Sequence, residues 1–274
     1  MRLKKIFIGS KNLSTKYTKY FQVYNELFSK YINKKITFVE IGVLNGGSLQ
    51  MWRKFFGQKA RIIGIDINPI CKKFRTKNIE IYIGDQSNPE FWINFFKRTG
   101  KVDVILDDGG HTNIQQIITT ASTIDKIKCG GTLVIEDTHT SYMKEFCNPM
   151  KYSFIAFAKK IIDDINFTFP KIGKFKFSVN KAIYSISFYE SITAFHINRK
   201  FCVSNKKFIN KGIDFNIEDL RYGIKNTQYD TFSKKIKTIV NKIFLLEILI
   251  RPFIFLRKKI KNIFDIKKYE MFFK

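Results

Sequence analysis

Residues 102–111 read Val-Asp-Val-Ile-Leu-Asp-Asp-Gly-Gly-His, and this stretch sets the pattern for the rest of the chain. An apolar, β-branched run that stops at two carboxylates, two glycines and a histidine predicts a buried strand that delivers polar groups to the edge of a sheet. The pattern recurs at residues 131–142, where Gly-Thr-Leu-Val-Ile is followed by Glu-Asp-Thr-His-Thr-Ser-Tyr. Apolar residues at helical spacing lie between the two runs, and Cys-Gly-Gly at residues 129–131 ends that helix. Together these features predict a βαβ unit.

The two carboxylate clusters of this unit should meet in space. A βαβ unit is right-handed and its strands are parallel, so both clusters emerge at the edge where open α/β sheets bind ligands. We therefore expect four side chains to converge: Asp108, His111, Glu136 and Asp137. The alternative is that the first cluster is a surface turn and the second a solvated strand end, which explains one cluster more readily than both.

Three earlier strands end in the same way. The first, at residues 36–42, contains Glu40 and leads into a glycine-rich turn, Gly-Val-Leu-Asn-Gly-Gly-Ser, at residues 42–48. Such a turn before a helix lets a ligand approach the backbone, but Leu44 breaks the dinucleotide fingerprint and counts against NAD. The next two strands end at Asp66, which is placed to accept the hydroxyls of an adenosine ribose, and at Asp85, which would lie beside the adenine. Any one carboxylate fits a helix N-cap, but all five strand ends together indicate a ligand-binding edge.

The flanking segments complete the outline. Residues 1–14 predict a short strand or arm, and residues 15–33 predict an amphipathic helix that packs on the sheet. A further helix is expected at residues 152–167. Residues 181–198 contain two β-rich runs without a helix between them, which predicts an antiparallel hairpin at the sheet edge. His196 lies in this hairpin and is expected to be structural.

Length, charge and cysteine content set broad limits. At 274 residues the chain can form one large α/β domain with additions, or two small domains. A formal charge of +26 would suggest nucleic acid or an anionic membrane, but Lys, Ile, Asn, Phe and Tyr are all favoured by AT-rich codons, so the charge is weak evidence. The four cysteines form no close pair and no zinc-like spacing, and the N-terminus has no signal-peptide pattern. We therefore expect unbridged thiols and a cytoplasmic protein.

The motifs together resemble a known family. The glycine-rich turn and the acidic end of the second strand resemble the class I S-adenosylmethionine-dependent methyltransferases. The Asp-Asp-Gly-Gly-His and Glu-Asp-Thr-His-Thr-Ser-Tyr motifs are similar to those of the metal-dependent sugar O-methyltransferases of macrolide and rhamnosyl type, with the cephalosporin hydroxylase-like proteins as close relatives. The resemblance implies an α/β fold, with a Rossmann-like, mostly parallel seven-stranded sheet ending in an antiparallel hairpin. The resemblance covers the methyltransferase domain expected at residues 36–200. The sequence pattern adds an N-terminal arm and helix at residues 1–35 and a basic amphipathic helical extension at residues 201–274.

The resemblance also assigns roles to individual residues. It implies that S-adenosylmethionine is bound by Glu40, Gly42, Gly46, Gly47, Ser48, Asp66, Asp85, Gln86 and Asp107. It implies Mg²⁺ bound by Asp108 and Asp137, with Glu136 as a further ligand, and His111 as the catalytic base beside Asp108. The expected reaction is methyl transfer to a sugar hydroxyl in a surface glycan or a glycosylated metabolite. Two alternatives stay open: a nucleic-acid methyltransferase, and a non-catalytic membrane-associated protein on a methyltransferase fold.

The last seventy residues carry none of these motifs. Residues 233–268 are rich in Lys and Arg interleaved with apolar residues and broken by Pro252. No apolar run approaches the roughly 20 residues that a membrane span needs, whereas a basic amphipathic helix at an anionic membrane surface, at the inner membrane face, fits the pattern. The alternatives are a helix pair packed on the catalytic domain or on a second subunit, which leaves a homo-oligomer open, and a nucleic-acid contact, which is the least favoured.

Overall fold

A seven-stranded sheet organises the computed structural model, which describes residues 2–146, 152–166, 181–213, 215 and 217. The strands are β1 (Thr37–Ile41), β2 (Arg61–Asp66), β3 (Ile79–Ile83), β4 (Val102–Asp107), β5 (Ile127–Ile135), β6 (Ile183–Tyr189) and β7 (Ile192–Ile197). The α-helices are α1 (Arg2–Ile8), α2 (Tyr20–Phe28), α3 (Gly47–Phe56), α4 (Pro89–Thr99), α5 (Asn113–Thr123) and α6 (Phe154–Asn166). Short 3-10 helices are η1 (Ser29–Tyr31), η2 (Pro69–Phe74), η3 (Ile124–Lys126), η4 (Thr138–Tyr142) and η5 (Lys144–Phe146).

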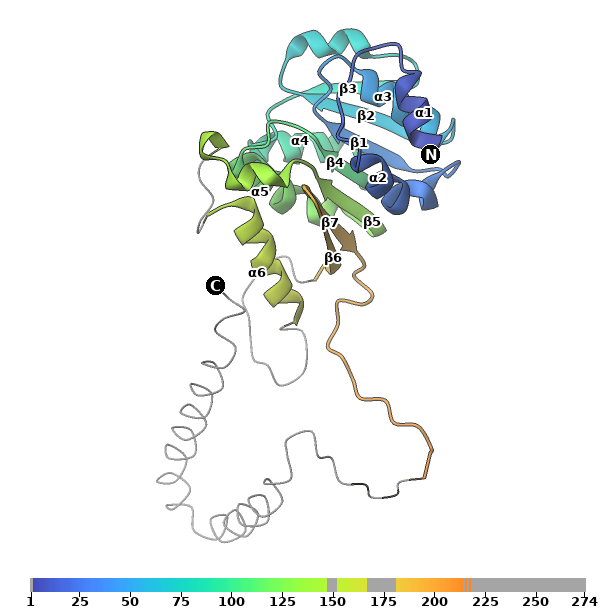
Figure 1. The fold of residues 1–274 in the computed structure, drawn as a ribbon, viewed down its shortest axis with the longest axis vertical. Helices are drawn as coiled ribbons and strands as arrows, with labels where there is room; N and C mark the ends of the chain where they lie inside the picture. Colours follow the sequence, from blue (N-terminus) through green and yellow to red (C-terminus); the bar gives the residue numbers. More distant parts are fainter. Residues whose placement is uncertain (1, 147–151, 167–180, 214, 216, 218–274) are drawn as a thin grey trace. The chain divides into compact units, whose positions relative to one another are not determined.

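The chain divides into two units, residues 1–207 and 208–274. The first unit contains the whole sheet and its helices (Figure 1). The expected basic helix at residues 233–268 lies outside the described residues. None of the helices within the described ranges has the length and apolar character needed to cross a membrane. Cys71, Cys129 and Cys202 are free thiols, in line with the absence of paired spacing.

The strand order is β3-β2-β1-β4-β5-β7-β6. The first five strands in this order pair in parallel, whereas β7 is antiparallel to both β5 and β6. This arrangement confirms the expected mostly parallel sheet with an antiparallel hairpin at one edge. The chain reverses direction across the sheet between β1 and β4, which is the point where open α/β sheets bind ligands.

The strand ends are level with one another. Ile41 of β1 aligns with Ile65 of β2 and with Asp107 of β4, and Asp107 in turn aligns with Ile135 of β5. The residues that follow these positions therefore emerge at one edge of the sheet. This register places the glycine-rich turn beside both carboxylate clusters.

Alternate strand residues face opposite sides of the sheet and build two cores. Phe38 and Val104 join the core beneath α1, α2 and α3, whereas their neighbours Val39 and Ile105 join the core beneath α4, α5 and α6. Figure 1 shows these two groups of helices on the two faces of the sheet. The central strands β2 and β4 are accordingly buried along almost their whole length, as parallel strands covered on both faces are.

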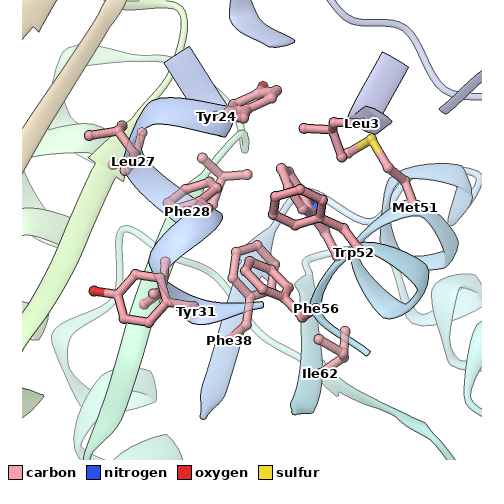
Figure 2. Close-up of a cluster of buried hydrophobic side chains, with 14 of the residues drawn as sticks. Leu3, Tyr24, Leu27, Phe28, Tyr31, Phe38, Met51, Trp52, Phe56 and Ile62 are labelled. Atoms are coloured by element: carbon pink, nitrogen blue, oxygen red, sulfur yellow. The ribbon is translucent and has the colours of Figure 1, made fainter. Parts of the chain in front are cut away.

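Aromatic rings fill the core on the α1–α3 side (Figure 2). The ring of Phe38 lies 4.9 Å from that of Phe56 and 5.1 Å from that of Trp52, while the ring of Phe28 lies 5.5 Å from Trp52. All four side chains are almost completely buried. Tilted and edge-on contacts of this kind add to the stabilisation that comes from burial alone.

The N-terminal residues differ from the expected strand or arm. Residues 2–8 form α1, whose Leu3 is fully buried, and the ring of Phe7 packs 5.0 Å from that of Phe21 in α2. Leu3 and Phe7 are four residues apart and share one helix face, so the segment is amphipathic although it is short. The expected helix at residues 15–33 is also shorter, since α2 begins at Tyr20 and gives way to η1 at Ser29.

The aromatic core predicts a large loss of stability on truncation. Phe38→Ala should lower the free energy of unfolding by about 3–5 kcal/mol, because it removes a fully buried ring and leaves a cavity between α2 and α3. Urea denaturation followed by circular dichroism measures this change. Phe188→Ala, at a side chain that is 44% exposed on β6, should cost about 1 kcal/mol or less, because little buried surface is lost. Equal losses in the two variants would contradict the packing described here.

Candidate active site

A cavity of about 480 Å³ lies at the carboxyl ends of the parallel strands. Its lining combines the turn after β1, the ends of β2 and β3, the carboxylate clusters after β4 and β5, and residues 13–17 from the N-terminal part of the chain. A volume of this size suits a ligand of cofactor dimensions. The structure therefore places the predicted ligand edge and both carboxylate clusters at the same cavity.

The glycine-rich turn packs directly on the first carboxylate motif. Gly42 has a φ of 92°, and a Cβ atom there would lie 2.0 Å from the carbonyl oxygen of Asp108. The backbone N–H of Asp108 donates to the carbonyl of Ile41 at 3.0 Å. Only glycine allows this approach, so the turn after β1 and the turn after β4 form one wall of the cavity.

Asp66 holds the outer part of the glycine-rich turn. Its Oδ2 accepts hydrogen bonds from the backbone N–H groups of Val43 at 2.9 Å and Leu44 at 3.0 Å, and its Oδ1 accepts one from Asn68 at 2.8 Å. Partial burial alone would raise the pKa of Asp66, but the three backbone donors keep it below its usual value. Asp66 is therefore a fixed carboxylate that lines the cavity.

Glu40 lies behind the cavity wall rather than in it. Its side chain is fully buried, and it accepts hydrogen bonds from the hydroxyl of Ser48 at 2.8 Å and the indole N–H of Trp52 at 2.9 Å. Burial raises its pKa to about 7, against the opposing effect of the Lys16 ammonium. Glu40 thus ties β1 to the first turns of α3.

A second buried pair shapes the turn after β4. The amide nitrogen of Gln86 donates to both oxygens of Asp107 at 2.9 Å, and the backbone N–H of Gly110 donates to the amide oxygen of Gln86 at 3.1 Å. Burial raises the pKa of Asp107 to about 6. Asp107 therefore serves as the internal anchor of the turn, while its neighbour Asp108 faces the cavity.

The predicted cofactor residues fall into two groups. Those that line the cavity are Gly42, Ser48, Asp66, Asp85 and Gln86. The remaining predicted residues, which support the wall without lining it, are Glu40, Gly46, Gly47 and Asp107. The sequence pattern pointed to residues of both groups, but it could not tell which of them line the cavity and which lie behind its wall.

The second half of the cavity carries a cluster with the character of a metal site. Asp108, His111 and Asp137 each offer one ligand atom, and these atoms lie within 4.8 Å of one another. Nε2 of His111 lies 3.4 Å from Oδ2 of Asp137. Two carboxylates and an imidazole at this spacing fit a divalent cation, and the carboxylate oxygens are the ligands that Mg²⁺ prefers. The convergence predicted for these three residues is present.

The backbone of this cluster is held in an unusual conformation. His111 and Asp137 both have positive φ angles, 59° and 53°, which residues other than glycine rarely adopt. The hydroxyl of Thr140 donates to the carbonyl of His111 at 2.8 Å, and Thr112 caps α5 through a reciprocal bond with Gln115. Such strained positions are characteristic of functional sites, where surrounding contacts maintain them.

Glu136 shares the donor Lys16 with Asp108 and has a second donor in Tyr24. Lys16 donates to Oε2 of Glu136 at 2.8 Å and also to Oδ2 of Asp108, and the hydroxyl of Tyr24 donates to Oε1 of Glu136. The hydroxyl of Tyr20 donates to Asp137. Glu136 lines the cavity and is fully buried, but both of its oxygens already accept hydrogen bonds.

Sequence analysis missed Lys16, Tyr20 and Tyr24 as residues of the site. Lys16 is one of many lysines in a strongly basic chain, and the two tyrosines fit the apolar face expected of a helix. Nothing in their spacing distinguishes them. Lys16 is buried between two carboxylates, and this position becomes apparent only from the path of residues 10–19 in the folded chain.

Comparisons with known proteins show which proteins the chain resembles. No family model matches the chain. Over 157 residues it is 27% identical to the 8-demethyl-8-alpha-L-rhamnosyl tetracenomycin-C 2'-O-methyltransferase of Streptomyces olivaceus, a match that covers 54% of this chain and 41% of that protein. Over 156 residues it is 33% identical to the mycinamicin VI 2''-O-methyltransferase of Micromonospora griseorubida, covering 52% of this chain and 38% of that protein. Over about half of its length the chain is therefore similar to sugar O-methyltransferases.

A solved structure extends the similarity to the fold. The MycE methyltransferase of the mycinamycin biosynthetic pathway, in complex with Mg and SAH, is 25% identical, with a TM-score of 0.66 over 77% of this chain and 57% of that one. This match confirms the class I methyltransferase fold predicted from the motifs. The chain spans less than half the length of the two sequence relatives described above.

The buried Glu40 predicts a specific pH dependence of stability. Its pKa of about 7 in the folded protein exceeds the ordinary value of 4.5, so between these values the folded state binds more protons on Glu40 than the unfolded state. The contribution of Glu40 to the free energy of unfolding should therefore fall as pH rises through this interval, by about 1–3 kcal/mol. Glu40→Gln removes the titrating group. Urea denaturation of both proteins at pH 5 and pH 7 measures the effect, and parallel pH curves would contradict it.

Proposed function

We propose that this chain is a Mg²⁺-dependent O-methyltransferase that moves a methyl group from S-adenosylmethionine to a sugar hydroxyl. The observation that carries the proposal is the convergence of Asp108, His111 and Asp137 along a cavity that the glycine-rich turn also lines. The names of the sequence relatives, both sugar O-methyltransferases, support it. So does the structural neighbour that contains Mg and SAH.

The cofactor would occupy the part of the cavity formed by β1, β2 and β3. The turn at Gly42 presents backbone without side chains, and the hydroxyl of Ser48 lies at the start of α3, where backbone N–H groups favour a carboxylate. Asp66 is already oriented by three N–H donors, and a carboxylate has further lone pairs that can accept the hydroxyls of a ribose. Asp85 and Gln86 lie at the end of β3, on the side proposed for the adenine.

The metal would be held mainly by Asp108 and Asp137. No described hydrogen bond uses Oδ1 of Asp108, and Oδ2 of Asp137 faces His111. Both oxygens of Glu136 are engaged by Lys16 and Tyr24, so the role of Glu136 is to support the site from behind. Bound Mg²⁺ would polarise the acceptor hydroxyl and lower its pKa.

His111 is the proposed base. Mg²⁺ prefers oxygen ligands, so the imidazole is better suited to accept a proton than to bind the ion. Its Nδ1 is buried and has no hydrogen-bond partner among the described residues, while Thr140 fixes its backbone. In the reaction His111 takes the proton of the hydroxyl, the oxygen forms a bond to the methyl carbon, and the carbon–sulfur bond breaks with its electron pair remaining on sulfur.

The cavity lining favours a neutral acceptor. Lys16 is the only Lys or Arg among the lining residues of the described part of the chain, and it is bound to carboxylates. Nucleic acids are held largely by cationic contacts to phosphates, which this lining does not offer. Leu13, Tyr17 and Leu44 also line the cavity and are more than half exposed, so the mouth presents apolar surface to an acceptor. These features support a sugar on a larger, partly apolar molecule over a nucleic acid.

A labelling experiment tests the activity. The full chain incubated with S-adenosylmethionine carrying a labelled methyl group should label a glycan or glycosylated-metabolite fraction. EDTA followed by dialysis should abolish the labelling and added Mg²⁺ should restore it, because an un-ionised alcohol is a poor nucleophile. Label in nucleic acid alone, or full transfer in EDTA, would contradict the proposal.

The base is tested by substitution at the histidines. His111→Ala should lower kcat by about 10²–10⁴, the usual contribution of a positioned base, while calorimetric affinity for S-adenosylmethionine stays within about twofold. His196→Ala is the matched control, because His196 bonds to Ser187 in the β6–β7 hairpin and lies outside the cavity lining. Near-normal kcat in His111→Ala would remove the histidine from the mechanism.

A further inference from the structure

The connecting segment, residues 10–19 between α1 and α2, brings a buried cation into the proposed metal site. The side chain of Lys16 is only 2% exposed, and its ammonium lies between Asp108 and Glu136. The contact with Asp108 spans 92 residues of sequence and that with Glu136 spans 120. A lysine is rarely buried unless its charge is paired, so this position is unlike that of the many surface lysines.

The connecting segment is hydrogen-bonded to α3 and to the turn that precedes it. The backbone N–H groups of Lys11 and Asn12 donate to the side-chain oxygen of Gln50 in α3, at 3.0 and 3.3 Å, and the side chain of Asn12 donates to the carbonyl of Asn45 at 2.9 Å. A Cβ atom at Gly47 would lie 2.3 Å from the carbonyl oxygen of Asn12. The segment therefore fits closely against the start of α3, and Lys16 reaches the carboxylates from a fixed backbone.

The ammonium of Lys16 is paired with carboxylates on two sides. Lys16 occupies one oxygen of Asp108 and one of Glu136, and Tyr24 occupies the other oxygen of Glu136. The two donors thus restrict Glu136, while Oδ1 of Asp108 has no described hydrogen bond.

We propose that Lys16 is a positioning residue that holds Glu136 away from the metal and lowers the affinity of the site for the ion. This inference rests on the proposed function and adds a residue to it. The ammonium repels a nearby dication, and this repulsion is stronger in a buried site than in water. Because Lys16 and Tyr24 hold Glu136, the carboxylate ligands of the ion would come from Asp108 and Asp137. Coordination positions would then remain for the two oxygens of an acceptor. Mg²⁺ sites of this kind usually keep several positions for water or substrate.

The first test measures metal binding without turnover. Lys16→Met keeps the length of the side chain but removes its charge and its hydrogen bonds, so Asp108 and Glu136 both become available to the ion. The affinity for Mn²⁺, measured by electron paramagnetic resonance in the absence of S-adenosylmethionine, should rise at least tenfold. The water-proton relaxivity of the bound Mn²⁺ should fall, because a carboxylate replaces a water ligand. An unchanged or weaker affinity in a folded variant would overturn the proposal.

Lys19→Met is the matched control. It makes the same change of charge in the same connecting segment, but Lys19 is 71% exposed and pairs with the exposed Glu190. Its Mn²⁺ affinity should stay within about threefold of wild type, since exposed charges are screened by water and salt. An equal rise in both variants would reduce the effect to overall charge and overturn the assignment to Lys16.

A second comparison does not depend on Lys16→Met folding. Glu136→Gln should lower Mn²⁺ affinity less than fivefold, because Glu136 is not a ligand while Lys16 is present, whereas Asp137→Asn should lower it at least fiftyfold. Adding Glu136→Gln to Lys16→Met should remove most of the gain. Equal losses in Glu136→Gln and Asp137→Asn would make Glu136 a ligand and overturn the proposal.

The outcomes separate this inference from the proposed function. If wild-type protein binds Mn²⁺ and transfers labelled methyl, but Lys16→Met gains no affinity, the role of Lys16 is overturned and the function stands. If wild-type protein binds no Mn²⁺ at millimolar concentration, both the metal-dependent function and the role of Lys16 are overturned.

Discussion

The close approach of Gly42 to Asp108 is the contact on which the site depends. It joins the turn after β1 to the turn after β4, two segments that are adjacent only because the strand order reverses between them. The proposed cofactor wall belongs to the first turn and the proposed metal ligands to the second. A side chain at residue 42 would separate the turns, so backbone contact sets the distance between the proposed cofactor wall and the proposed metal ligands. Backbone contacts of this kind vary less than contacts between flexible side chains.

Buried polar groups fix the rest of the geometry. Glu40 and Asp107 lie on neighbouring strands and do not line the cavity, yet both are buried carboxylates whose hydrogen bonds go to adjacent elements. Burying such groups is unfavourable unless every partner is in place, so they specify one arrangement of α3 and of the turn after β4. Asp66 does the same with backbone donors. The side chains proposed to touch ligands are therefore held by an outer set of polar contacts, as an active site that must keep a fixed geometry requires.

Local pattern was enough to predict the sheet and most of the cavity. Apolar runs that end in carboxylates gave the parallel strands and their common edge, and the absence of a helix at residues 181–198 gave the antiparallel hairpin. The different roles of the two adjacent carboxylates at a strand end were not predictable from the sequence. Asp107 and Asp108 are the same residue type and are adjacent in sequence, and Glu136 and Asp137 are adjacent carboxylates. In each pair both oxygens of one member accept hydrogen bonds from the protein, while the other member belongs to the cluster with His111. Which member does so follows from the pleat of the strand and from neighbours distant in sequence, and neither is written in the motif.

The N-terminal residues show the same limit more sharply, and they change what belongs to the site. A helix of seven residues, in which Leu3 and Phe7 share one face, gives too little periodic signal to outweigh an extended arm. Once α1 packs against α2 and α3, however, residues 10–19 have to cross the start of α3 to reach Tyr20, and this path carries Lys16 to the carboxylates. The three donors that reach Asp108, Glu136 and Asp137 from this region, Lys16, Tyr20 and Tyr24, lie within nine residues of sequence. The N-terminal region is therefore one wall of the cavity, and its packing positions the donors that contact the carboxylates.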